Sequence, residues 1–191
     1  MIIADGIPAD LTDQAADLYW QAFRDKLRIA MGPQDKALAF VRRVLRPDHA
    51  ISATANGQLL GVVGYKTLDG ALVGGDFGDL RAIYGMFGAL WRAGALALLE
   101  RDVENERFLM DGIFVHEEAR GRGVGSALLN AVCDTARTRG YSEIRLDVID
   151  SNPRARALYE RRGFHPVATA DLGPLRHLFG FKSATTMVRK L

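Results

Sequence analysis

Hydrophobic residues recur at helical spacing through the first quarter of the chain and then alternate as they do in strands. Apolar positions three and four residues apart over 11–23 and 37–45 predict two amphipathic helices. The runs 51–55 and 59–67 are joined by an Asn-Gly dipeptide, which favours the tight turn of a β-hairpin. A short strand is predicted to follow at 71–73.

The segment from Asp76 to Glu100 is long and apolar and contains several glycines. A membrane span is one interpretation, but Asp79, Arg81 and Arg92 lie inside it, and each charge costs roughly 2.5–3.5 kcal/mol near a bilayer centre. We therefore predict a pair of buried or interface helices that pack over an edge of the sheet near the acceptor site. So much apolar surface is a liability on a monomer, which favours a homodimer.

The second half of the chain alternates between strand-like and helix-like patterns. The expected elements are helices that begin near Val124 and Pro153 and strands at 108–115, 144–148, 164–169 and 185–189. Gly140 and Gly163 follow the two helices, where glycine commonly ends a helix. The alternation indicates an α/β fold with a mixed sheet. No linker or repeat divides the chain, so residues 1–191 are predicted to form a single domain.

Composition narrows the classes of function. The chain has 191 residues, 48% of them hydrophobic, and its net charge of +2 gives no reason to expect a nucleic-acid or membrane partner. The one cysteine, Cys133, cannot form an intrachain disulfide, and four scattered histidines lack metal-ligand spacing, so no metal is expected. The first residues show no basic region followed by an apolar run, so we expect a cytoplasmic protein.

A glycine-rich run lies between the predicted strand at 108–115 and the helix after it. Glycine lets the backbone turn tightly and bring bare amides close to an anion, and a helix N-terminus adds unpaired N–H groups and partial positive charge. Two arginines in the run add charge-assisted contacts to phosphate. These features predict a pyrophosphate cradle formed by Arg120, Gly121, Arg122, Gly123, Val124, Gly125 and Ser126.

The pattern of this run discriminates between phosphate ligands. A dinucleotide-binding fold requires glycine or alanine where Ser126 stands, and a turn directly after the strand, whereas residues 116–119 intervene here. A P-loop requires Gly-Lys followed by Ser or Thr, which is absent. A glycine-rich connection that binds no ligand is the structural alternative.

The run and a second motif together resemble the GNAT superfamily of N-acetyltransferases. Arg120-x-x-Gly123-x-Gly125 matches that family's pyrophosphate signature, and residues 152–164, Asn-Pro-Arg-Ala-Arg-Ala-Leu-Tyr-Glu-Arg-Arg-Gly-Phe, match its second motif. The resemblance is strong over 108–164. It implies the acyl-CoA N-acyltransferase fold with acetyl-CoA as co-substrate. The segment predicted to be helical before the strand at 108 would then be an addition between the third and fourth core strands.

The resemblance also implies roles for individual residues. Backbone groups of Ile113, Phe114 and Val115 would meet the pantetheine arm where their strand separates from its neighbour. Asn152 would contact the cofactor, and the same residue type suits a helix N-cap. Tyr159 would lie near the thioester and protonate the leaving thiolate, with a packed aromatic as the structural alternative.

Transfer to an amine requires that a proton be removed. An alkylammonium has a reference pKa of about 10.4, so only about one molecule in a thousand carries a free lone pair at pH 7. Asp111 is the candidate base because it lies in the strand that leads to the glycine-rich run, and a carboxylate bonded only to backbone is the alternative. Strand alternation places Asp111 on the side of Leu109 and Ile113.

The remaining expectations concern the acceptor and the type of attack. The resemblance implies a small-molecule or peptide amine as acceptor, and a non-catalytic acyl-CoA-binding or regulatory module is the alternative function. His116 replaces part of the family's Val-x-Pro sequence and is interpreted as a loop residue, and Cys133 as a packing residue, which favours direct attack by the amine. The segment 172–182, with Arg176 and His177, is expected to line the acceptor side.

Overall fold

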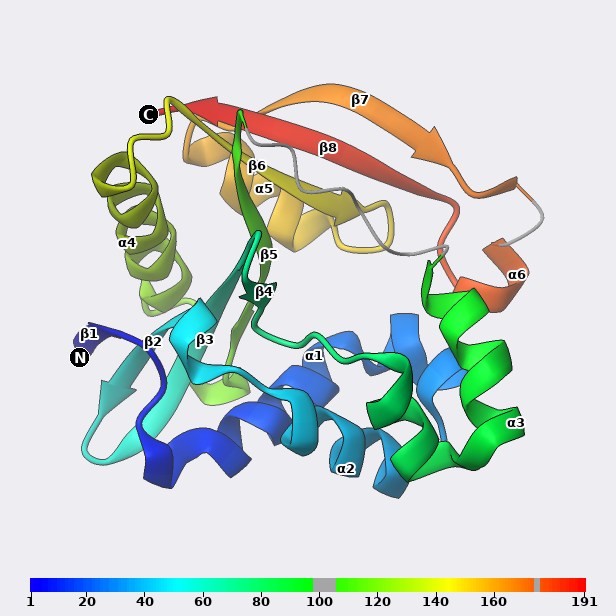
Figure 1. The fold of residues 1–191 in the computed structure, drawn as a ribbon. Helices are drawn as coiled ribbons and strands as arrows, with labels where there is room; N and C mark the ends of the chain where they lie inside the picture. The colour runs from blue at the N-terminus through cyan, green and yellow to red at the C-terminus, as the bar shows by residue number, and fades with distance from the viewer. Residues whose placement is uncertain (98–105, 174–175) are drawn as a thin grey trace.

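The computed structural model describes residues 1–97, 106–173 and 176–191, which form one eight-stranded sheet with helices on both faces (Figure 1). The strand order is β1-β2-β3-β5-β6-β8-β7, with β4 paired to β3. The strands are β1 (Ile2–Asp5), β2 (Ala50–Ala55), β3 (Gln58–Thr67), β4 (Gly70–Ala71), β5 (Phe108–Val115), β6 (Glu143–Ile149), β7 (His165–Asp171) and β8 (Ser183–Lys190). The helices are α1 (Thr12–Met31), α2 (Gln34–Val44), α3 (Phe77–Ala97), α4 (Val124–Thr138), α5 (Pro153–Arg161) and α6 (Arg176–Phe179).

Most elements predicted from the sequence are confirmed, because their signals are local. The hairpin of β2 and β3 turns at Asn56 and Gly57, whose φ angles of 52° and 74° suit the tight turn that an Asn-Gly pair favours. Strand β1 was missed because its four residues are mostly exposed at the sheet edge and carry no alternation of burial. The strand predicted at 71–73 is shorter, and beyond Ala71 only an isolated bridge joins Val73 to Leu45.

The mixed sheet has apolar clusters on both faces. One cluster joins α4 and Tyr159 of α5 to the strands, with Phe108, Leu128 and Ile144 almost fully buried. On the other face α1 and α2 pack against β2 and β3, with Val62 fully buried between them. Every adjacent pair of strands is antiparallel except β5 and β6, which distinguishes this sheet from the parallel sheet of a dinucleotide-binding fold.

The segment expected to contain two helices forms α3, which is interrupted at Gly85. The φ of 72° and ψ of 175° at Gly85 are not helical, so two helical pieces meet there. The prediction that this segment packs over the sheet edge is wrong: its buried residues, Leu80, Tyr84 and Ala89 among them, pack mainly on α1 and α2. Residues 98–100 of the predicted segment lie outside the described residues.

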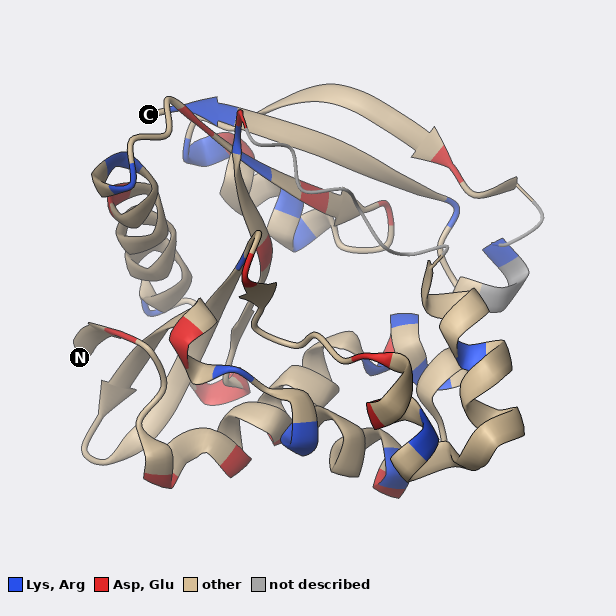
Figure 2. Cartoon of the chain, viewed as in Figure 1, with Lys and Arg blue, Asp and Glu red and all other residues tan. Residues whose placement is uncertain are grey.

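The opposite face of α3 carries large apolar side chains, with Phe87 88% exposed and Leu90 67% exposed. The homodimer expected from this surface stays a prediction. In the described ranges no helix has the length and apolar character needed to cross a membrane. Basic and acidic residues are interspersed along the ribbon (Figure 2), in keeping with the near-neutral net charge.

Candidate functional site

Strands β5 and β6 separate soon after they begin to pair. Only Phe108↔Ile144 and Leu109↔Arg145 are in register between them. Beyond these pairs β5 stays with β3 up to Val115, and β6 stays with β8. One side of the β5 backbone after Leu109 therefore has no neighbouring strand in the described sheet, and its N–H and C=O groups face the opening between the two strands.

The glycine-rich run forms an open turn between β5 and α4. Gly121 and Gly123 have φ angles of 77° and 80°, which glycine adopts without the strain that other residues incur. A Cβ at either position would meet nothing within 4 Å, so the turn is accessible from outside. Gly123 is the N-cap of α4 and no side chain caps that helix, which leaves its first N–H groups available to an anion.

Gly125 allows the start of α4 to lie against α5 and β5. A Cβ at Gly125 would come within 3.3 Å of Leu158 Cδ2, and it would contact Val115 Cγ2 at 3.8 Å and Ile113 Cδ1 at 4.0 Å. A larger residue would push these elements apart. The two family motifs and the open side of β5 therefore meet at one place, as the sequence resemblance implied.

The other predicted cofactor-binding residues lie around this junction with different orientations. Val124 is buried in the cluster beside α4, so it offers its backbone N–H rather than its side chain. The Arg120 Nε donates to the Val115 carbonyl oxygen at 3.3 Å and ties the turn to the end of β5. Arg122 is exposed and Ser126 is half-buried.

Asn152 is confirmed as the N-cap of α5, since its Oδ1 accepts the Ala155 N–H at 3.2 Å. Its side chain remains exposed. Two turns further along that helix, Tyr159 is only 5% exposed. The centre of its ring lies 5.9 Å from the centre of the Phe164 ring. Burial raises the pKa of the Tyr159 hydroxyl, which keeps it protonated at neutral pH.

Asp111 occupies a β-bulge. Gly64 of β3 pairs with Gly112 and the next residue, Tyr65, pairs with Met110, so Asp111 has no partner across the ladder. An extra residue in one strand reverses the alternation of side chains beyond it. The prediction that Asp111 shares a side with Ile113 is therefore wrong.

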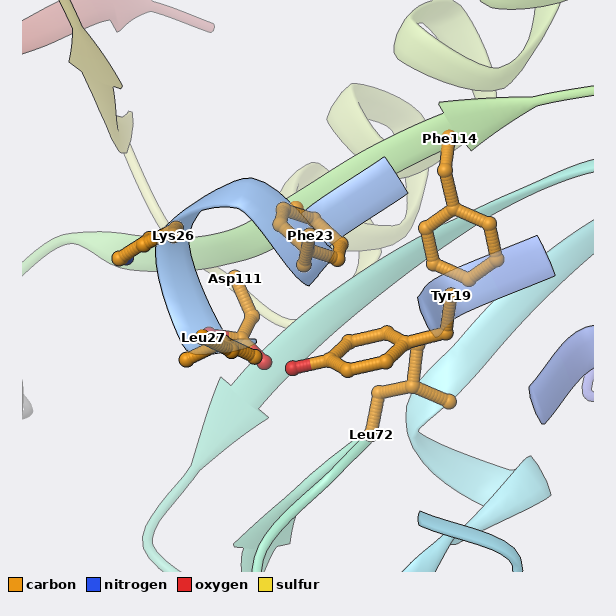
Figure 3. Close-up of a pocket in the computed structure, with 8 residues that line it drawn as sticks. Tyr19, Phe23, Lys26, Leu27, Leu72, Asp111 and Phe114 are labelled. Carbon is orange, nitrogen blue, oxygen red and sulfur yellow. The ribbon is translucent and has the colours of Figure 1, made fainter. Parts of the chain in front are cut away.

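Ile113 packs into the cluster beside α4, whereas Asp111 lines a small cavity that faces α1, together with Gly112 and Phe114. This cavity has a volume of about 70 Å³ (Figure 3). The Tyr19 hydroxyl points toward the Asp111 carboxylate, and Lys26 lies on the same stretch of α1. The Tyr19 ring is held by Phe23 and Phe114, whose ring centres lie 4.7 and 5.7 Å away.

The surroundings of Asp111 raise the pKa of its carboxyl. Asp111 is exposed to solvent through the cavities that it lines, yet the protein around it partly desolvates its carboxyl, and this desolvation raises its pKa above the ordinary value for aspartate. Lys26 and Lys66 lower the pKa and partly offset the rise. A carboxylate with a raised pKa is a stronger base than one at the ordinary aspartate pKa, which is what proton abstraction from an ammonium requires.

Sequence reasoning missed Tyr19 and Lys26 as neighbours of Asp111. Tyr19 was assigned to the apolar face of the first helix by its spacing, and that spacing carries no sign of a partner in β5. Tyr19, Phe23 and Lys26 follow one another at intervals of four and three, so they share one face of the helix. The hydroxyl of Tyr19 and the ammonium of Lys26 on this face were the signal in the sequence that it meets a polar group.

Two other candidates take the roles expected of them. His116 is exposed in the turn after β5, where its backbone N–H donates to the Leu60 carbonyl oxygen at 2.8 Å. Cys133 is fully buried in α4, and burial raises the pKa of its thiol, which makes it a poor nucleophile. No group of three or more potential metal ligands occurs in the ranges that the structure covers.

Comparison with known proteins identifies the family. The model of the acetyltransferase (GNAT) family matches residues 12–164. The chain belongs to this family. The GNAT chain is 52% identical over 50 residues to a mycothiol acetyltransferase from Beutenbergia cavernae, a match that covers 26% of the chain and 17% of that relative. It is 37% identical over 62 residues to a thialysine N-epsilon-acetyltransferase from Bos taurus, covering 32% of the chain and 36% of the relative.

A crystal structure of an N-acetyltransferase from Staphylococcus aureus Mu50 has the same fold as the GNAT chain. The two superpose with a TM-score of 0.68 at 13% identity, over 98% of this chain and 100% of the other. The fold predicted from the sequence, a mixed sheet of GNAT type, is thus confirmed. The matches to the two curated relatives span less than two fifths of either one's length.

Proposed function

We propose that this protein is an N-acetyltransferase that moves the acetyl group of acetyl-CoA to a primary amine by direct attack. The observation that carries the proposal is the meeting of the glycine-rich turn, the uncapped start of α4 and the open side of β5, with Asp111 reached from the α1 side of the same strand. Residues 1–191 act as one domain in this proposal.

Acetyl-CoA fits the donor side on chemical grounds. The absence of a Cβ at Gly121 and Gly123 leaves open space for a pyrophosphate, and backbone N–H groups within 121–126 would supply its donors, since the Arg120 N–H is bonded to the Glu117 carbonyl oxygen. The backbone groups on the open side of β5, within the run Ile113, Phe114 and Val115, would match the amides of the pantetheine arm, as a neighbouring strand would. Asn152, at the start of α5, is proposed to contact the arm.

In the proposed reaction Asp111 removes a proton from the acceptor ammonium, and the neutral nitrogen attacks the thioester carbonyl. Backbone N–H groups of the open strand stabilise the oxyanion that forms. Collapse of the tetrahedral intermediate breaks the C–S bond, and the Tyr159 hydroxyl gives its proton to the departing thiolate. Attack forms the N–C bond, the second nitrogen proton passes to the Tyr159 oxygen as the amide forms, and the proton held by Asp111 leaves to solvent, so the products are the amide and the CoA thiol. Transfer is direct in this proposal, because the buried Cys133 thiol is not placed to attack the thioester and carry the acetyl group.

The proposal is tested by binding and turnover together. Titration calorimetry should show CoA binding and much weaker binding of NAD. Release of free thiol from acetyl-CoA should depend on the addition of a primary amine. Binding of NAD without CoA would contradict the donor assignment, whereas CoA binding without turnover on any amine would favour a non-catalytic module.

Replacing Tyr159 with phenylalanine should lower kcat by about 10²-fold or more, the range typical of a lost general acid, while the Kd for CoA changes little. The substitution removes one hydroxyl and keeps the buried ring against Phe164. Tyr141→Phe is the matched control, because Tyr141 also packs on a phenylalanine ring but lies beyond the far end of α4. An unchanged kcat in Tyr159→Phe would assign the proton to water instead.

A further inference from the structure

A cavity of about 960 Å³ opens beside Asp111, on the side of the sheet away from α4. Helices α1, α2 and α3 form its floor and strands β5, β6 and β8 its roof, and these elements face one another in Figure 1. Pockets for organic ligands have volumes of roughly 300–1,000 Å³, so this cavity has room for a substantial molecule. It reaches the point where β5 and β6 separate, because Met110, Asp111 and Asp147 line it there.

The walls of the cavity are mainly apolar. Trp20, Leu27 and Met31 come from α1, Leu80 and Leu96 from α3, and Phe181 from the opposite side. These side chains belong to three different parts of the chain, so the apolar surface lies on several sides of the space rather than on one wall. A ligand that fills it exchanges water for hydrocarbon contact along much of its length.

The charged residues of the cavity are largely committed to contacts within the protein. At the start of α3, Asp76 Oδ1 accepts the Asp79 N–H, and Asp79 Oδ1 accepts the Arg43 Nε–H at 2.7 Å. On β6, Asp147 Oδ1 accepts the Thr186 hydroxyl at 2.5 Å, and its other oxygen lies 3.8 Å from Arg145.

Among the described residues, five carboxylates and three basic side chains line the cavity, and Arg43 and Arg145 pair with two of these carboxylates from outside the lining. Such a lining offers no series of sites for a molecule with several positive charges. Asp111 and Asp147 both line the cavity where β5 and β6 separate, and Asp147 is already bonded to Thr186 and lies near Arg145. The lining is thus suited to one ammonium group at the inner end and an apolar group along the rest.

We propose that the acceptor is a primary amine that carries one extended apolar group, alkyl or arylalkyl, with the nitrogen beside Asp111 and the apolar group between α1 and α3. This inference rests on the proposed acetyl transfer and specifies its substrate class. Polyamines and polycationic sugars are disfavoured, because their additional charges would lie against Trp20, Leu27 and Leu96.

The test is the dependence of kcat/KM on the chain length of the amine, in a series from butylamine to octylamine. The rate is measured as the release of free thiol from acetyl-CoA. Each buried methylene should raise kcat/KM by about fourfold, and spermidine should be slower than hexylamine. Equal kcat/KM for butylamine and octylamine, or a preference for spermidine, would overturn the substrate class while leaving acetyl transfer intact. If no amine supports thiol release, the proposed function itself is wrong and this inference is wrong with it.

A pair of variants on α3 locates the binding site. Ala93 lines the cavity, and Ala82 is exposed on the same helix outside the cavity lining. Ala93→Phe should shorten the available space, so octylamine loses at least about tenfold in kcat/KM while butylamine changes little, and Ala82→Phe should change neither. Circular dichroism establishes that both variants fold, and Ala93→Val replaces Ala93→Phe if the larger side chain prevents folding. Equal behaviour of the two positions would place the apolar group elsewhere.

Discussion

Gly123→Glu is expected to abolish CoA binding while the protein remains folded. A Cβ at Gly123 meets nothing within 4 Å, so the new side chain begins in open space and occupies the turn where the pyrophosphate is proposed to lie. Its carboxylate would repel the phosphates and displace them from the N–H groups at the start of α4. Loss of two charge-assisted hydrogen bonds, at about 1.5–3 kcal/mol each, predicts a rise in Kd of about 10²-fold or more by calorimetry.

Gly140→Glu is the matched control for this variant. Gly140 has a φ of 83°, close to the 80° of Gly123, and a Cβ there also meets nothing within 4 Å. It follows α4 at the helix's other end, so both variants carry the same backbone strain and the same new charge. Their thermal stabilities should fall by similar amounts, but only Gly123→Glu should lose CoA. Equal loss of CoA binding in the two variants would mean that the turn is not the phosphate site.

Asp111→Asn is expected to lower kcat by about 10²–10⁴-fold at neutral pH, the usual value of a general base. The amide cannot accept the ammonium proton, so the reaction must draw on the small fraction of free amine, and its rate maximum should move to higher pH. The pH-rate profile of the variant should also lose the limb on which the wild-type rate falls as Asp111 becomes protonated. An unchanged profile would show that water or another group removes the proton.

Asp69→Asn provides the control, since Asp69 lines the same cavity and is exposed in the turn between β3 and β4. Asp69→Asn changes the charge of the cavity by the same amount as Asp111→Asn. Its kcat should stay within about threefold of the wild-type value, because solvent screens an exposed charge. A drop in both variants would attribute the effect of Asp111→Asn to charge rather than to proton transfer.

The raised pKa of Asp111 also has a consequence for stability. The folded state holds the Asp111 proton more tightly than the unfolded chain does. Folding is therefore penalised as pH rises from the ordinary aspartate pKa through the raised one, and above the raised pKa the penalty is fully present. Asp111→Asn removes it, so the melting temperature of the variant relative to wild type should increase as pH rises through the same interval. Reduced activity together with increased stability in Asp111→Asn would indicate that the Asp111 carboxylate serves catalysis at a cost in stability.

The sequence by itself determined the features that depend on near neighbours in the chain. The Asn56-Gly57 turn, the glycine-rich run before α4 and the Asn152 cap are local choices of backbone conformation, and each occurs where the residues predicted it. The order of strands and helices after residue 108 followed from hydrophobic periodicity for the same reason. Two motifs separated by the length of one helix and one strand were therefore sufficient to identify the family.

The tertiary structure alone decided what surrounds Asp111. Its orientation depends on a bulge, which is a property of the register between β3 and β5 rather than of either strand's sequence. Tyr19 and Lys26 approach it because α1 crosses that strand, and the large cavity exists because α3 packs on α1 and α2 instead of covering the sheet. Contacts between segments some 90 residues apart are set by the packing of whole elements, so no local pattern in the chain encodes them.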